Sequence, residues 1–257
     1  MKFFEFGKEN KKTLLLLCGW SANWMGAMPT INVLKKQFHV IVDAYDGFNP
    51  DEPNTTFKSV VSEGQAAANY IAEHFGGKLD IIYGVSLGGM VMTELLLDKR
   101  IMVHTAIADG FTIQEFHYKK ASTKKFVAKL ISGLGYTFMV RHRIFLTLVS
   151  KIIGRTKEQL DTVIYKKASR ESYFNGEYML MDYCYKYEVF AKTDFYIWHS
   201  HMEKGSIKKI KHLKEQGYPL THWIFSDVGH GGFAQQPERL IKEINRAYYH
   251  DFTASDR

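Results

Sequence analysis

One stretch, residues 79–90, restricts the folds available to this chain more than any other. It begins with Leu79-Asp80-Ile81-Ile82-Tyr83, a mostly apolar run of the kind that forms a buried parallel strand. The turn Gly84-Val85-Ser86-Leu87-Gly88 follows at once, and residues 90–97 then have a helical composition. A Gly-x-Ser-x-Gly turn between a strand and a helix exposes its serine at the apex. We therefore predict a nucleophile elbow with Ser86 at its tip.

The residues that flank Ser86 favour this interpretation on physical grounds. Gly84 and Gly88 lack a Cβ atom, so the strand and the helix can approach each other closely on either side of the serine. The helix directs its N-terminal N–H groups, and the positive end of its dipole, at the serine oxygen. The alternative is an ordinary serine in a glycine-rich turn, and catalytic partners elsewhere in the chain would argue against it.

Short apolar runs alternate with helical patterns in the N-terminal part of the chain, up to residue 110, and again in the C-terminal part, from residue 194. This alternation is typical of an α/β fold with a doubly wound, mostly parallel sheet. A length of 257 residues suits one such domain, or a core with one insertion. We expect strands at residues 2–6 (an edge strand), 13–17, 39–43, 79–83, 102–108, 194–198 and 220–225, and helices at residues 29–37, 57–75, 90–97, 206–216 and 237–249.

Between residues 111 and 193 the alternation stops, and the pattern is helical with basic and aromatic residues mixed. We predict that this segment is a helical cap inserted after the sixth core strand, and that residues 1–110 and 194–257 form the core domain. The cap would lie over the C-terminal edge of the sheet, where such folds place their sites. Ten apolar or aromatic residues of this segment are candidates for the wall of an apolar pocket, although we expect more of them to form the core of the cap than to line the pocket. They are Phe126, Leu130, Tyr136, Phe138, Phe145, Tyr173, Phe174, Tyr178, Tyr183 and Tyr187.

Positive charge is concentrated in the same segment. Residues 112–193 hold 15 Lys and Arg against 7 Asp and Glu, whereas the whole chain has a formal charge of +7. The simpler interpretation is a solvated, lysine-rich helical surface. The more specific interpretation is a docking surface for an acidic partner, such as an acidic acyl carrier protein that presents the substrate. No recognised nucleic-acid-binding motif accompanies the charge, so we expect no nucleic-acid partner.

The cysteines and the N-terminus suggest a location. Cys18 and Cys184 lie far apart and match neither a metal-ligand spacing nor a disulfide framework, which is typical of a reducing compartment. Residues 1–6 lack the features of a signal peptide, and no apolar run approaches the length of a membrane span. We expect a soluble, cytoplasmic protein without a membrane span.

A serine nucleophile needs a base within hydrogen-bond reach, and eleven histidines compete for this role. His230 stands out because it lies in a glycine-flanked loop after the last predicted strand, from which it can reach Ser86. His199 and His201 form a His-x-His pair that can bind a metal, but the sequence places no third ligand beside them. We therefore expect no metal site and no cofactor, and we give the other histidines no role.

With Ser86 and His230 in this order, and with a Gly-His-x-x-Phe loop around His230, the chain resembles the α/β-hydrolase fold family over nearly its whole length. The resemblance implies a Ser–His–acid triad in the chain order Ser, acid, His. It also implies an oxyanion hole made by two backbone N–H groups, those of Leu87 and Trp20. The pair Gly19-Trp20 resembles small carboxylesterases, although many members have histidine where this chain has Cys18.

The acid is the least certain member of the predicted triad. The family usually takes it from the turn after the strand at residues 194–198, where Glu203 can orient an imidazole. Some relatives take it from the end of the preceding strand, which here offers Asp109. We predict Glu203, with Asp109 as the alternative acid. Asp227 is less favoured, because it is only three residues from His230. The absence of any acid is also less favoured.

These residues predict a serine hydrolase of the carboxylesterase or thioesterase type, with a small-molecule acyl ester or thioester as its substrate. Ser86 would form an acyl-enzyme, and His230 would act as the base. Two alternatives stay open. One is a C–C bond hydrolase or a lyase that uses the same triad, and the other is a non-catalytic, ligand-binding member of the fold.

Overall fold

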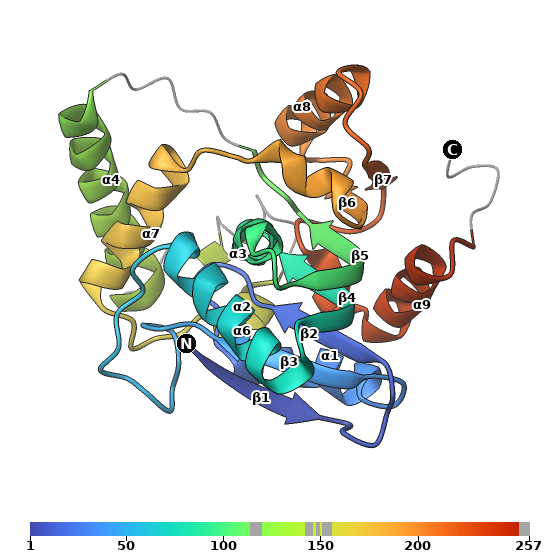
Figure 1. The fold of residues 1–257 in the computed structure, drawn as a ribbon. Helices are drawn as coiled ribbons and strands as arrows, with labels where there is room; N and C mark the ends of the chain where they lie inside the picture. The colour runs from blue at the N-terminus through green and yellow to red at the C-terminus, as the bar shows by residue number, and fades with distance from the viewer. Residues whose placement is uncertain (114–119, 142–145, 148–149, 151–155, 252–257) are drawn as a thin grey trace.

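The computed structural model describes residues 1–113, 120–141, 146–147, 150 and 156–251. Within these residues a seven-stranded sheet has the strand order β1-β3-β2-β4-β5-β6-β7 (Figure 1). Only β1 is antiparallel to its neighbour, and the other pairs are parallel. The strands are β1 (Lys2–Phe6), β2 (Thr13–Leu17), β3 (His39–Ala44), β4 (Lys78–Val85), β5 (Met102–Asp109), β6 (Asp194–Ser200) and β7 (Thr221–Phe225). The predicted fold class, a doubly wound and mostly parallel α/β sheet with an edge strand at the N-terminus, is confirmed.

The central strands are apolar on both faces because helices cover both faces of the sheet. Leu15 of β2 lies beside Ile82 of β4, and both side chains are fully buried. A strand–helix–strand crossover in a parallel sheet is right-handed. The crossovers of α2, α3 and α8 run toward β7, so these helices cover one face. The crossover of α1 runs the other way, and α1 packs with α9 on the opposite face (Figure 1). The helices are α1 (Met28–Leu34), α2 (Val60–Phe75), α3 (Leu87–Leu97), α8 (Lys204–Glu215) and α9 (Pro237–Tyr248).

The described residues between β5 and β6 are mainly helical. They include α4 and α7, which lie side by side (Figure 1). The insertion therefore follows the fifth strand in chain order, and the predicted position after a sixth strand is wrong by one. The apolar runs that precede residue 111 number five, so the error is one of counting and not of pattern. The division into core and cap domains stays a prediction. The helices are α4 (Ala121–Gly135), η2 (Tyr136–Arg141), α6 (Lys157–Val163), α7 (Arg170–Asp182) and η3 (Tyr187–Ala191).

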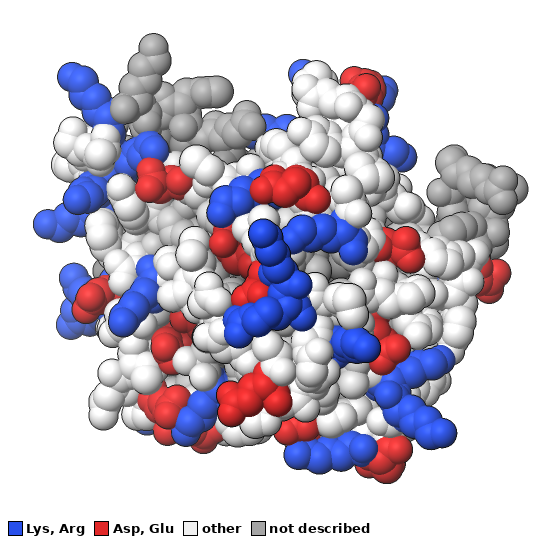
Figure 2. Space-filling model, viewed as in Figure 1, with Lys and Arg blue, Asp and Glu red and all other residues white. Residues whose placement is uncertain are grey.

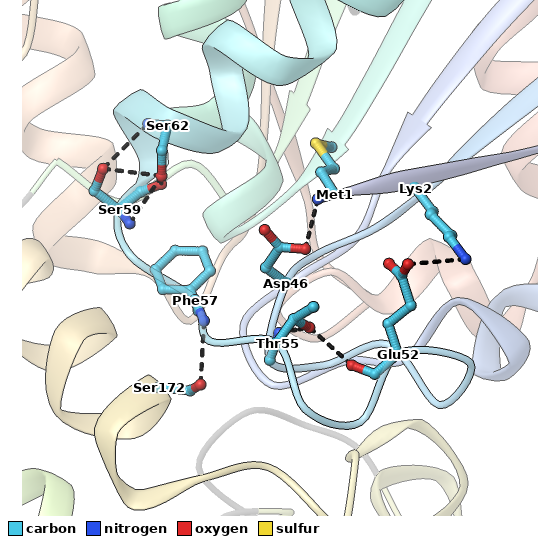
Figure 3. A network of polar contacts seen from close by, with 10 residues as sticks. Met1, Lys2, Asp46, Glu52, Thr55, Phe57, Ser59, Ser62 and Ser172 are labelled. Atoms are coloured by element: carbon cyan, nitrogen blue, oxygen red, sulfur yellow. Dashed lines mark hydrogen bonds and ion pairs between the residues drawn. The ribbon is translucent and has the colours of Figure 1, made fainter.

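The loop between β3 and α2 connects the sheet to the insertion (Figure 3). Ser172 of α7 accepts a hydrogen bond from the Phe57 backbone N–H at 3.1 Å, and Asn175 of α7 donates one to the Phe57 carbonyl at 2.9 Å. Ser59 and Ser62 then form a reciprocal capping box that starts α2. These backbone contacts hold α7 against the core beside the sheet.

Charges on the insertion are partly neutralised within it. Lys124 lies 2.6 Å from Asp182, and Lys166 lies 3.4 Å from Asp161. Acidic side chains also lie among the basic ones over the face that Figure 2 shows. Docking of an acidic carrier protein on this segment stays a prediction. None of the helices in the described part of the chain has both the length and the hydropathy needed to cross a membrane.

Candidate active site

Ser86 lies between β4 and α3, where the chain turns sharply. Its backbone has φ 52° and ψ −108°, a conformation that an L-residue adopts at a cost of about 1–3 kcal/mol. The Ser86 N–H donates a hydrogen bond to the Asp109 carbonyl at 2.8 Å, which fixes the turn to the end of β5. Helix α3 begins at the next residue, Leu87, so its N-terminal dipole points toward the serine.

The two glycines of the turn are required by close backbone contacts. A Cβ at Gly84 would lie 2.7 Å from the backbone of Gly88. A Cβ at Gly88 would lie 2.3 Å from the Leu17 carbonyl oxygen of β2. Strand, helix and neighbouring strand can therefore pack at this distance only because both positions lack a side chain, as the sequence pattern predicted.

Glu203 and His230 come together although 27 residues separate them. His230 Nδ1 donates a hydrogen bond to Glu203 Oε1 at 2.8 Å. The other carboxylate oxygen accepts the Ser200 N–H at 2.7 Å. Burial acts to raise the pKa of Glu203, but the hydrogen bond and charge of His230, the charge of His199 and the Ser200 N–H outweigh it and hold that pKa below its ordinary value. The carboxylate is thus kept ionised beside the imidazole.

A contact with Gly110, which the sequence analysis missed, holds the imidazole of His230 in position. A Cβ at Gly110 would lie 2.7 Å from His230 Cε1 and 2.8 Å from Nδ1, so the ring lies against the Gly110 backbone. Gly110 directly follows Asp109, whose carbonyl binds the Ser86 N–H. No direct hydrogen bond links the Ser86 hydroxyl to this imidazole within the described chain, and such pairs are often loose before substrate binds. Both side chains line one cavity.

The other candidate acids lie in different surroundings. Asp109 is buried, and its carboxylate accepts a hydrogen bond from the Tyr83 hydroxyl at 2.5 Å. Asp227 is exposed and forms a two-bond ion pair with Arg239, at 2.6 and 3.1 Å. Of the three acids, Glu203 is the one that the structure places within hydrogen-bond distance of His230.

The loop that would supply the second oxyanion donor passes next to the serine. A Cβ at Gly19 would lie 3.9 Å from Ser86 Cβ, and Trp20 follows directly. The Trp20 indole packs edge-on against Phe57 and Tyr173, with ring centroids 5.6 and 5.4 Å away. This packing holds the loop in place, and the oxyanion roles of the Trp20 and Leu87 N–H groups stay predictions.

Cys18 is part of this loop. Its backbone N–H donates a hydrogen bond to Asp43 Oδ1 at 2.7 Å, and its carbonyl accepts one from the Tyr45 hydroxyl at 3.1 Å. The side chain is 7% exposed, and burial raises the pKa of the thiol well above its ordinary value. Cys18 therefore packs as a small apolar residue, and its thiol stays protonated at neutral pH.

The cavity beside Ser86 and His230 has a volume of about 250 Å³. Much of its wall comes from the loop after β2 and from the short helix η1 (Trp24–Ala27), and Val163 and Ile164 contribute to it from the insertion. Ile164 forms an isolated β-bridge with Ala22. None of the described aromatic and apolar residues expected as pocket walls lines the cavity. Tyr173 is buried and Phe126 is 68% exposed, whereas Phe145 lies outside the described residues.

His199, which is buried and close enough to Glu203 to affect its pKa, pairs with the partly buried His222, and the sequence analysis did not predict this pair. His199 is fully buried; its Nε2–H donates to the Phe111 carbonyl at 2.7 Å, and its Nδ1 lies 2.9 Å from His222 Nε2. Burial lowers the pKa of His199. Burial, followed by the electrostatic effect of His199, lowers the pKa of His222 to about 4. His201 is exposed at the following turn, so the two histidines of the His-x-His pair do not face one site. No local pattern predicts the pairing of positions 199 and 222.

Neither a family model nor a curated protein sequence matches this chain. Solved structures do match. An alpha/beta hydrolase family protein from Desulfitobacterium hafniense is 22% identical with a TM-score of 0.74, covering 95% of this chain and 100% of its own. A thermophilic esterase from Thermogutta terrifontis is 17% identical with a TM-score of 0.73, covering 98% and 94%. MenH from S. aureus is 12% identical with a TM-score of 0.70, covering 97% of both chains.

Fold and site together define an α/β protein with a serine at a strained strand–helix turn and a carboxylate-bound histidine beside it. The structural matches extend over nearly the whole chain. This chain has the α/β-hydrolase fold, and the resemblance noted from the elbow and the His230 loop is confirmed at that level.

Proposed function

We propose that this protein is a serine hydrolase that cleaves a carboxylic ester or thioester through an acyl-enzyme on Ser86. The observation that carries the proposal is the 2.8 Å hydrogen bond between Glu203 and His230, beside a cavity that Ser86 also lines. A serine hydroxyl is a weak nucleophile, and an imidazole held in one orientation by a carboxylate is the usual means of activating it. Structural neighbours that are hydrolases and esterases support the assignment.

In the proposed mechanism, Ser86 Oγ attacks the carbonyl carbon while His230 Nε2 accepts the hydroxyl proton. Glu203 keeps the Nδ1–H of the ring directed at its own carboxylate, which leaves the lone pair on Nε2 and stabilises the imidazolium that forms. The Leu87 and Trp20 N–H groups bind the oxyanion. His230 then protonates the leaving alcohol or thiol, and water attacks the acyl-enzyme by the reverse sequence.

The lining of the cavity supports a proposal about the substrate class. No lysine, arginine, aspartate or glutamate is among its described lining residues, and alanine, glycine, valine and isoleucine form much of its wall. Two polar side chains in the wall, those of Asn23 and Thr30, are hydrogen-bonded to nearby backbone carbonyls. Asn23 donates to the Val163 carbonyl at 2.8 Å, and Thr30 donates to the Ala234 carbonyl at 3.1 Å. We propose an uncharged acyl group of small to medium size.

A chain-length series of p-nitrophenyl esters and the matching acyl thioesters tests the proposal, with products identified by mass spectrometry. We expect turnover to peak at a short or medium chain and to fall by several orders of magnitude in Ser86→Ala. Ser62→Ala, which changes a serine of the α2 capping box, is the matched control and should keep its activity. Near-wild-type turnover by Ser86→Ala would exclude the mechanism, and products of C–C cleavage or elimination would change the reaction class.

A further inference from the structure

Two histidines and an aspartate from three separate parts of the chain meet at the edge of the sheet opposite Ser86. His104 lies near the start of β5, Asp194 begins β6, and His250 follows the end of α9. One potential ligand atom from each lies within 4.8 Å of the other two. Ser86 instead follows the carboxyl end of β4, so the cluster is separate from the candidate active site.

Neighbouring hydroxyl groups orient both imidazoles. Nδ1 of His104 lies 2.8 Å from Thr105 Oγ1, and Nδ1 of His250 lies 3.1 Å from the Tyr196 hydroxyl. A ring that donates its Nδ1–H to an oxygen has its lone pair on Nε2, and metal-binding histidines are usually held in this way. Nε2 of His250 lies 3.3 Å from Asp194 Oδ2. Donor atoms around a tetrahedral Zn²⁺ lie about 3.3 Å apart, given its bond lengths to N and O.

The backbone at His250 presents this side chain from an unusual position. Helix α9 ends in a Schellman motif, in which the His250 N–H donates to the Ala247 carbonyl and the Asp251 N–H donates to the Arg246 carbonyl. His250 is the left-handed residue of that motif, with φ 54°, a place that glycine fills most easily. Here a histidine fills it, and its ring reaches Asp194 and Tyr196.

We propose that His104, Asp194 and His250 form a binding site for a divalent first-row transition metal ion of the Zn²⁺ type. Two imidazoles and one carboxylate suit such an ion, and a fourth position faces solvent in an open hollow of about 760 Å³. Lys192, which also borders the hollow, is directed away and donates to the Leu96 carbonyl at 2.7 Å. The sequence-based expectation of no metal site rested on local spacing, which cannot bring positions 104, 194 and 250 together.

Calorimetric titration of the untagged, chelator-treated full chain with ZnCl₂ tests the proposal. We expect saturable binding of about one ion per chain, together with a rise in melting temperature that grows with ZnCl₂ concentration. The decisive variant is His250→Gly, because glycine suits the left-handed position and leaves the helix end intact. This variant should bind Zn²⁺ more than about tenfold more weakly, and Tyr196→Phe should weaken binding about tenfold.

His212→Gln is the matched control, since His212 is an exposed histidine 3.8 Å from Glu215 on α8 and outside the cluster. It should bind Zn²⁺ as the wild type does. Absence of a saturable site in the wild type would overturn the proposal, as would equal Zn²⁺ affinity in wild type and His250→Gly. Asp194→Asn provides a second, independent loss of a ligand and should also weaken binding.

Discussion

The imidazole of His230 lies directly against the backbone of Gly110, so closely that a methyl group at position 110 would overlap the ring. This contact connects the end of β5 with the loop that follows β7. It holds the proposed base on the side of Glu203, and the same strand end binds the Ser86 N–H.

Gly110→Ala should therefore damage activity more than it damages folding. The new Cβ would displace His230, and a shift of about 1 Å in a catalytic group can reduce the rate on the order of 100-fold. Gly110 also has φ +68°, so alanine adds backbone strain. Gly76→Ala is the control, because Gly76 has φ +59° and no atom within 4 Å of its added Cβ. If both variants lose esterase kcat/KM equally, the contact with His230 has no catalytic importance.

The identity of the acid can be tested by two isosteric changes. Glu203→Gln should lower kcat on the order of 10³–10⁴-fold, because a neutral amide neither stabilises the imidazolium nor enforces one tautomer. Asp109→Asn should retain most activity, since Asp109 lies against Tyr83 rather than His230. Steady-state kinetics on a p-nitrophenyl ester measures both. A collapse of activity in Asp109→Asn alone would contradict the assignment of Glu203.

Helix α7 of the insertion should support the Trp20 loop through Gly176. A Cβ at Gly176 would lie 1.8 Å from the Trp20 ring, so Gly176→Ala must move either the helix or the indole. We expect a loss of about 1–3 kcal/mol in the free energy of unfolding, together with reduced activity. Gly133→Ala on α4 is the control, because nothing lies within 4 Å of its Cβ. Urea unfolding and esterase assays that show no difference between the two variants would argue against this support.

Asp43 should make stability depend on pH. Burial raises the pKa of Asp43 from its ordinary value of 3.8 to about 6. Between these pH values the folded state holds a proton that the unfolded state has lost, so the free energy of unfolding falls as pH rises through this window. Asp43→Asn removes the titration and keeps an oxygen acceptor for the Cys18 N–H. Urea titrations from pH 4 to 7 should show a flatter profile for the variant, and parallel profiles would contradict the prediction.

Local pattern predicted most of the core and part of the site. Alternation of apolar runs located all the strands of the described sheet, and the Gly-x-Ser-x-Gly turn located Ser86. The pairing of Glu203 with His230 was a choice among acids, because the geometry of the loop after β6 depends on tertiary packing. Gly110 could not be foreseen as the support of His230, since only the folded sheet brings these residues together. For the same reason the insertion contributes Val163 and Ile164 to the cavity wall, whereas none of the predicted aromatic residues that the structure describes lines it.

The most direct test of the central claim is covalent labelling with a fluorescent fluorophosphonate, which reacts with an activated serine. Native protein, Ser86→Ala and His230→Ala should be compared at equal concentration, with circular dichroism to establish that each is folded. The proposed mechanism predicts strong labelling of the native protein, none of Ser86→Ala and little of His230→Ala. Equal labelling of native protein and Ser86→Ala, or no labelling of the folded native protein, would contradict it.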